Sequence, residues 1–289
     1  MKHIFYVCGA VFLIALFACN LSPETNKKDN KAKEKPTSVE LTKYTLVKGE
    51  IPVENIRDNS SGMTYNWDTK TLFIVIDSPR RIVECDKEGK FKRIITLNKF
   101  SDPEGIAYLG DGKFAVLEER RCKASVVTIT DKTDHINYSD VKQTLIEKER
   151  VGNKGLEGIT YDPVNKMVYV IKEKRPRKIY KFPREELGKE EAKVTHPWDA
   201  KKDSLNLADF SDLFYHKETG HLLMLSHESF CLIECTLDGK KVSELSLREG
   251  AAGLKTTIPK AEGIVMDENG TIFICSEGRT PLYVYKKKK

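Results

Sequence analysis

One stretch of this chain recurs five times, and the repetition restricts the fold more than any other feature. Each copy has a short apolar strand, a polar turn carrying Asn, Asp or Gly, and a second strand rich in Val, Ile, Phe or Tyr. The copies are SGMTYNWDTKTLFIVID (61–77), EGIAYLGDGKFAVLEE (104–119), EGITYDPVNKMVYVIKE (157–173), SDLFYHKETGHLLMLSHE (211–228) and EGIVMDENGTIFICSE (262–277). The spacing between successive copies along the chain, together with their composition of strands, is typical of a propeller.

Further strands follow the copies and allow the blades to be counted. A third strand follows every copy, at 81–86, 125–129, 178–182, 231–236 and 282–286, and a fourth follows two of them, at 90–97 and 241–247. We predict an all-β fold, a β-propeller of five blades with four antiparallel strands each. Residues 39–47 would supply the strand that closes the ring, and 184–191 a short helix. Six blades, with a repeat hidden in 130–150 or 184–207, are the alternative.

The N-terminal residues indicate a targeting sequence followed by a tether. An apolar run from Ile4 to Ala18 is too short to span a bilayer comfortably and is flanked like the core of a signal peptide. Residues 16–19, Leu-Phe-Ala-Cys, resemble the lipobox of bacterial lipoproteins, in which the cysteine is lipidated. We predict a lipoprotein signal peptide over 1–18, lipidation of Cys19, a flexible tether over 19–38, and one propeller domain over 39–289. A plain secretory signal or a membrane anchor is the alternative.

Charge and cysteine usage limit the partners. The net charge of +6 comes from the tails, because residues 19–38 hold five lysines against three acids and the chain ends in four lysines. The segment between them is close to neutral, whereas a nucleic-acid-binding domain needs a basic face on the fold itself. We therefore expect no nucleic-acid partner, and a monomer. The five cysteines of the domain show no disulfide or zinc spacing, so we expect buried thiols.

Acidic residues recur at the start of the repeat. Glu104, Glu157 and Glu262 each precede a glycine of the first strand, and Asp212 is the nearest counterpart in the fourth copy. Carboxylates around one narrow mouth repel one another unless a cation lies among them. We predict a metal site formed by Glu104, Glu157, Asp212 and Glu262, with Ca²⁺ as the ion because it prefers oxygen ligands. Alternatively, the same carboxylates accept hydrogen bonds from backbone amides of neighbouring blades.

A second set of acids ends the second strands, which return to the same face of the disc. Basic residues stand beside these acids in the following loops. An acidic centre with a basic collar would hold a metal and then an anionic ligand, such as a phosphate ester or an acidic glycan, or an envelope protein. The predicted ligand-binding residues are Glu119, Arg120, Glu173, Arg175, His227, Glu228, Glu277 and Arg279. Ion pairs on a solvated loop face are the alternative.

Catalytic residues are not identified by any motif. Ser226, His227 and Glu228 are the residue types of a triad, but neighbours in a strand point to opposite faces and cannot form its hydrogen bonds. The chain contains no GxSxG elbow, Walker loop, dinucleotide fingerprint or HExxH motif. Whether the protein is an enzyme is therefore left open.

The blade pattern resembles the NHL-type propeller repeat. The phrases VIKEKRPRKIYKF (170–182), LSHES (225–229) and KAEGIVMDENGTIFICSE (260–277) are similar to those of the SdiA-regulated, YjiK-like family of bacterial envelope propellers, over roughly residues 40–286. That family includes a protein described as a calcium-regulated β-propeller. The resemblance implies a periplasmic or membrane-attached propeller with calcium involvement and no settled reaction; a fold alone does not give chemistry.

Three functions follow from these patterns. The first is a propeller lipoprotein of the cell envelope that binds a ligand or partner on one face, with Ca²⁺ at the mouth of the channel. The second is a metal-dependent hydrolase of the phosphoesterase or lactonase kind, with Glu157 or Glu262 as ligand or base. The third is a protein-interaction scaffold without metal.

Overall fold

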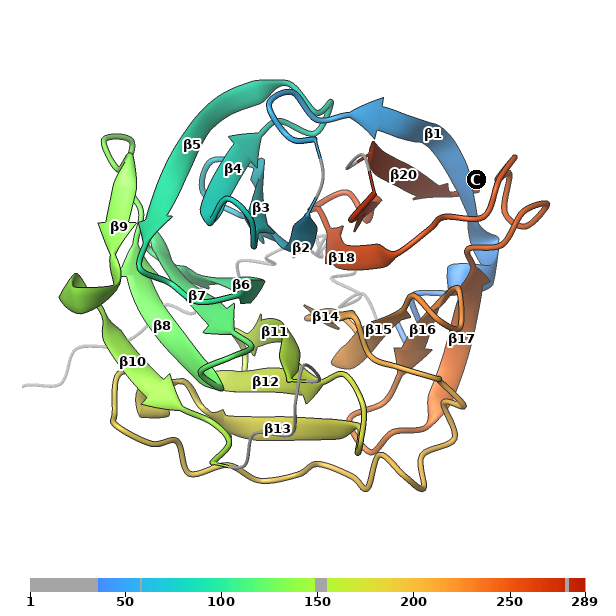
Figure 1. The fold of residues 1–289 in the computed structure, drawn as a ribbon. Helices are drawn as coiled ribbons and strands as arrows, with labels where there is room; N and C mark the ends of the chain where they lie inside the picture. Colours follow the sequence, from blue (N-terminus) through green and yellow to red (C-terminus); the bar gives the residue numbers. More distant parts are fainter. Residues whose placement is uncertain (1–35, 58, 149–154, 279–280, 289) are drawn as a thin grey trace, which may run out of the picture. The chain divides into compact units, whose positions relative to one another are not determined.

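Five β-sheets surround a central axis in the computed structural model, which describes residues 36–57, 59–148, 155–278 and 281–288 (Figure 1). Each sheet is one blade, and the strands β2, β6, β11, β14 and β18 lie nearest the axis. The prediction of an all-β, five-bladed propeller is confirmed. No helix among the described residues is long and apolar enough to cross a membrane.

The blades follow one another along the chain. Blade I contains β2 (Ser60–Asn66), β3 (Thr71–Ile76), β4 (Arg81–Cys85) and β5 (Phe91–Asn98). Blade II contains β6 (Pro103–Gly110), β7 (Lys113–Glu118), β8 (Lys123–Thr128) and β10 (Lys142–Leu145). Blade III contains β11 (Leu156–Asp162), β12 (Met167–Lys172) and β13 (Lys178–Pro183). Blade IV contains β14 (Asp212–His216), β15 (His221–Ser226), β16 (Cys231–Cys235) and β17 (Lys241–Ser246).

Blade V joins the two ends of the domain. Its strands β18 (Ala261–Met266), β19 (Ile272–Ser276) and β20 (Pro281–Lys287) come from the C-terminus, and its outer strand β1 (Tyr44–Pro52) comes from the N-terminus. Strand β1 pairs antiparallel with β20, from Tyr44 opposite Lys287 to Pro52 opposite Pro281. The segment predicted to close the ring does so, although the strand begins after the short 3₁₀-helix η1 (Leu41–Lys43).

The long gaps between repeats contain no sixth blade among the described residues. Strand β9 (His135–Asn137) adds to blade I by parallel pairing with β5, and the 3₁₀-turn η2 (Tyr138–Asp140) leads into β10. The helix predicted over 184–191 is a single 3₁₀-turn, η3 (Arg184–Glu186). Thr195 then bridges Lys181 beside β13, in the place that a fourth strand takes in the other blades.

Turn chemistry fixes the inner hairpins. The side chain of Asn66 accepts a hydrogen bond from the amide of Asp68, Asp162 accepts from Val164 and Asn165, and Asp267 accepts from Asn269 and Thr271. These Asx turns replace backbone partners that the strands lose where the chain reverses. The polar turns expected from the sequence therefore set the register of the first two strands in blades I, III and V.

The core lies between the blades. Each of five apolar clusters draws buried side chains from two adjacent blades, so that no blade buries its faces alone. The cysteines at 85, 122, 231, 235 and 275 are all buried, as expected. Cys231 and Cys235 belong to the same cluster, because they share one face of β16.

Glycines in the inner strands permit a close approach at the axis. A Cβ atom on Gly62 would lie 2.5 Å from the carbonyl oxygen of Glu104, and one on Gly158 would lie 2.7 Å from Oδ1 of Asp212. Any side chain there would force the inner strands apart. One pocket lies on each side of this layer, and the two are lined by opposite ends of the same inner strands.

Closure of the ring can be tested by truncating one side chain of the N-terminal segment. Leu41 is fully buried in the cluster between blades IV and V, so Leu41→Ala should lower the free energy of unfolding by about 2–5 kcal/mol. Val47 on β1 is 47% exposed, and Val47→Ala should change it by under about 0.5 kcal/mol. Urea denaturation measures both variants, and equal effects would contradict ring closure by this segment.

Candidate functional site

Seven carboxylates line a pocket of about 220 Å³ at the end of the ring where the inner strands begin. We call it the acidic pocket. Its acids are Asp77, Glu104, Glu119, Glu157, Glu173, Glu262 and Glu277, and its remaining residues are Asn59, Ser60, Ser61, Ser211 and His227. The predicted convergence of first-strand and second-strand acids on one face is therefore present in the fold.

Irregular pairing in the inner strands directs the first set of acids to the axis. The ladder between the first two strands shifts register between Ser60 and Gly62, between Pro103 and Gly105, between Leu156 and Ile159, and between Ala261 and Gly263. The skipped residues include Ser61, Glu104, Glu157 and Glu262. A bulge re-aims the side chain of its extra residue, which explains how these side chains reach the pocket.

Asp212 lies elsewhere. It pairs with Leu225 as the glycines of the other copies pair with their second strands, so Ser211 is the true counterpart of the three glutamates. Asp212 is 2% exposed, and its Oδ2 accepts a hydrogen bond of 2.9 Å from the amide of Ile264 in blade V. Burial raises its pKa well above the usual range, against the effect of this hydrogen bond. It links two blades and does not line the acidic pocket.

Two carboxyl groups of the pocket have raised pKa values. Burial raises the pKa of Glu157 well above its usual range, and repulsion from Glu104, Glu119 and Glu262 adds to the effect. Burial likewise raises the pKa of Glu104, while a hydrogen bond from Ser61 opposes the rise. Ionising both carboxyls at neutral pH therefore costs free energy unless a cation enters.

The tightest group of acids lies between blades I and II. One ligand atom from each of Asp77, Asp102 and Glu104 can be chosen so that all lie within 4.8 Å of one another. Oδ1 of Asp77 is buried without a hydrogen-bond partner, and burial raises the pKa of this carboxyl. The only basic partner of the three among the described residues is Arg120, whose Nε lies 2.7 Å from Asp102. Three oxygen donors at this spacing can hold a hard cation.

The opposite side of the pocket has its own cation. Nδ1 of His227 lies 2.9 Å from Asp209 and 3.2 Å from Glu262. These hydrogen bonds raise the pKa of His227 to about 10, so its imidazole is protonated at neutral pH. Ser226 donates to Asp209 rather than to His227, which agrees with the expectation that Ser226, His227 and Glu228 form no triad.

The second predicted set of residues is only partly assembled. Glu119, Glu173, His227 and Glu277 line the acidic pocket. Glu228 pairs with Lys174 at 2.6 Å, Arg120 is half-exposed on Asp102, and Arg175 is exposed. Arg279 lies outside the described residues. The basic collar is thus not gathered around the acids among the residues described.

Two acids that matter here were missed by the sequence analysis. Asp102 and Asp209 stand two residues before Glu104 and Ser211, in the same place as Asn59 before Ser61. Aligning the copies two residues further upstream would have revealed this polar position. Blade III has Gly155 there, and its amide donates a hydrogen bond of 2.8 Å to Glu119.

Comparison with known proteins supports the fold and identifies a family. A family model described as SdiA-regulated matches residues 36–286. The crystal structure of Myxococcus xanthus glutaminyl cyclase is similar with a TM-score of 0.56 at 13% identity, over 84% of this chain and 95% of that one. A chain in the crystal structure of a nidogen/laminin complex gives a TM-score of 0.50 at 13% identity, over 81% and 84%. Likeness at such identity concerns the fold alone.

The imidazolium in the pocket makes stability depend on pH. Since the folded pKa of His227 is raised from 6.5 to about 10, its contribution is fully present below pH 6.5 and is lost as pH rises through about 10. We expect His227→Gln to lower the free energy of unfolding by about 3 kcal/mol at pH 6 and by much less at pH 10. Urea denaturation in chelator measures this. The control His135→Gln, at an exposed site on β9, should show little effect at either pH; a pH-independent loss in His227→Gln would contradict the assignment.

Proposed function

The chain belongs to the SdiA-regulated family, and we propose that it is a binding protein of the bacterial cell envelope whose acidic pocket holds a divalent cation. One observation carries the proposal: the ligand atoms of Asp77, Asp102 and Glu104 converge within 4.8 Å, and Glu157, in the same pocket, repels Glu104. Ca²⁺ fits best, because it takes six to eight oxygen ligands in flexible geometry and carboxylates are its preferred protein donors.

The proposed ligands lie toward blades I and II. Glu262 is already paired with the His227 imidazolium, and Glu277 with Lys260 at 2.7 Å. Glu104 and Glu157, in contrast, have no basic partner among the described residues. A cation would therefore gain most beside Glu104, where Asp77 and Asp102 complete a set of three donors. Water or a ligand would fill the other positions of the ion.

The protonated state of His227 argues against its acting as a general base. A general base must be unprotonated at the working pH, whereas hydrogen bonds to Asp209 and Glu262 raise the pKa of His227 to about 10. The bound ion would instead supply the positive charge that the arginines do not bring to the pocket. An anionic group, from a phosphate ester, an acidic glycan or an envelope protein, could then complete the coordination of the ion.

Attachment to the envelope rests on the N-terminal sequence. The lipobox-like residues 16–19 place Cys19 seventeen residues before Pro36, where the described domain begins. The intervening segment is rich in lysine and poor in large apolar side chains, which suits a solvated tether. A lipidated Cys19 would hold the propeller at a membrane surface outside the cytoplasm.

Calcium should stabilise the protein, and one substitution distinguishes a metal site from a structural network. At a hundredfold excess over its dissociation constant, calcium should add about 2.7 kcal/mol to the free energy of unfolding. Glu104→Gln should raise stability in chelator, because it removes a partly buried charge repelled by Asp102 and Asp77, and should weaken the response to calcium.

Thermal melts with calcium or chelator test both statements. The exposed control Glu88→Gln should leave the calcium response unchanged. If the carboxylates only brace the fold, Glu104→Gln will lower the melting temperature equally with and without calcium. That result, with a wild-type melt indifferent to chelator, would refute the metal site.

The tether can be tested in cells. Cys19→Ala should leave the protein unprocessed or release it from the membrane fraction, because stable attachment needs the acyl chains of a lipoprotein. Cys8→Ala, inside the predicted signal peptide, should leave attachment intact. Fractionation followed by salt and detergent washes measures the distribution, and extraction of the wild type by salt alone would contradict lipid anchoring.

A further inference from the structure

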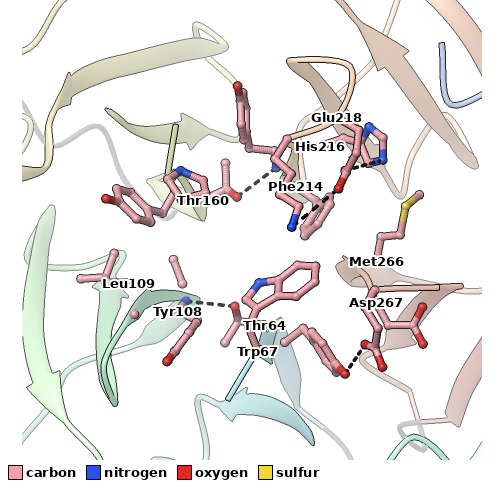
Figure 2. Close-up of a pocket in the computed structure, with 18 of the residues that line it drawn as sticks. Thr64, Trp67, Tyr108, Leu109, Thr160, Phe214, His216, Glu218, Met266 and Asp267 are labelled. Atoms are coloured by element: carbon pink, nitrogen blue, oxygen red, sulfur yellow. Dashed lines mark hydrogen bonds and ion pairs between the residues drawn. The ribbon is translucent and has the colours of Figure 1, made fainter. Parts of the chain in front are cut away.

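A second cavity, of about 580 Å³, lies at the end of the ring where the inner strands finish (Figure 2). We call it the aromatic pocket. Aromatic side chains from four blades line it: Tyr65, Trp67, Tyr108, Tyr161, Phe214 and Tyr215. Its volume is within the range of about 300–1,000 Å³ that is usual for small-molecule sites.

Threonine side chains link adjacent blades in the wall of the aromatic pocket. Oγ1 of Thr64 accepts a hydrogen bond of 3.0 Å from the amide of Tyr108, and Oγ1 of Thr160 accepts one of 3.0 Å from Tyr215. Tyr65 donates its hydroxyl to Glu268 at 2.5 Å, and Tyr108 donates to Asp68. The hydroxyls of Tyr65 and Tyr108 are therefore occupied, and what the walls offer a ligand is chiefly ring and aliphatic surface.

Charged groups at the rim are paired within the protein. Lys87 lies 3.0 Å from Asp267 and 3.3 Å from Glu268, and Lys217 lies 3.6 Å from Glu218. Nζ of Lys217 lies 5.0 Å from the centre of the Trp67 ring, a cation–π distance.

This pairing discriminates between ligand classes. A cationic ligand would compete with Lys217 for Trp67, and an anion would meet the carboxylates of Glu218, Asp267 and Glu268. A sugar needs many free hydrogen-bond partners, and most polar side chains here are already bonded. An uncharged apolar molecule meets none of these penalties and gains from burial against aromatic rings.

We propose that the aromatic pocket binds an uncharged, mainly apolar small molecule that carries flat rings. Trp67, 36% exposed at the mouth, is the side chain on which the ligand stacks, beside Phe214 (Figure 2). Ala107, 3% exposed, lies in the wall where a larger side chain would fill the cavity.

The chain's own N-terminal segment does not match the cavity. Pro36 contributes to the lining, and residues 20–35 precede it in the sequence. Residues 20–35, however, contain a single large apolar side chain, Leu21, and five lysines. Their composition suits water rather than an aromatic cavity, so a separate apolar molecule is the better occupant.

The experiment is a fluorescence titration of the chain from residue 20 with N-phenyl-1-naphthylamine, a neutral two-ring probe. The protein has two tryptophans, Trp67 in the pocket and Trp198 packed against Gly239. Saturable binding of one probe should quench the emission of Trp198→Phe, in which Trp67 is the sole tryptophan. The same probe should change the emission of Trp67→Phe far less.

Two blocking variants complete the test. Ala107→Phe should abolish saturable binding, and Trp67→Ala, at a site exposed enough to leave folding intact, should weaken it about tenfold, the loss of one stacking contact. Val164→Ala, at a 62% exposed residue outside the lining, should bind as the wild type does. Absence of saturable binding, unaltered binding in both blocking variants, or tighter binding of tetraethylammonium or maltose would overturn the proposal. None of these outcomes depends on the metal site.

Discussion

The five inner strands approach one another closely at the axis, and the two pockets of this propeller depend on that close approach. It requires residues without a Cβ atom, because a Cβ atom on Gly62 or Gly158 would lie within 2.7 Å of an atom from the next blade. The one exception is Asp212, whose buried carboxylate accepts a backbone hydrogen bond from Ile264 in blade V. The layer therefore separates the axial space into two pockets. Each pocket can bind a ligand of its own chemistry.

The acidic pocket owes its properties to its place directly above this layer. Bulges bring three glutamates and Ser61 to equivalent positions, and burial raises the pKa of Glu104 and Glu157. The charge is then compensated unevenly. His227 pairs with Glu262, Lys174 with Glu173, and Lys260 with Glu277. Asp77, Glu104 and Glu157 have no basic partner among the described residues. This asymmetry, rather than the number of carboxylates, distinguishes one side as the place for a cation.

Sequence reasoning recovered the elements that repeat and missed those that do not. Strand alternation and Asx turns recur in register, so blade count, ring closure and the convergence of Glu104, Glu157 and Glu262 could be predicted. Asp212 was misplaced as a counterpart of these glutamates, because a one-residue offset cannot be detected until pairing shows that it occupies a glycine position. Asp102 and Asp209 were missed because they precede the strands. The basic loops were expected at the pocket, but the directions of their side chains depend on local partners such as Asp102.

The two pockets also differ in the source of the free energy that a ligand would gain by binding. In the acidic pocket, burial makes the ionised carboxylates costly in free energy. A bound cation would offset this cost and raise the free energy of unfolding. In the aromatic pocket the rim charges are paired within the protein, as in the pairs of Lys87 with Asp267 and of Lys217 with Glu218. A ligand there can gain only by removing apolar surface from water. The same strands thus present an electrostatic site at one end and a hydrophobic one at the other, because strand positions before the glycine layer carry carboxylates and positions after it carry rings.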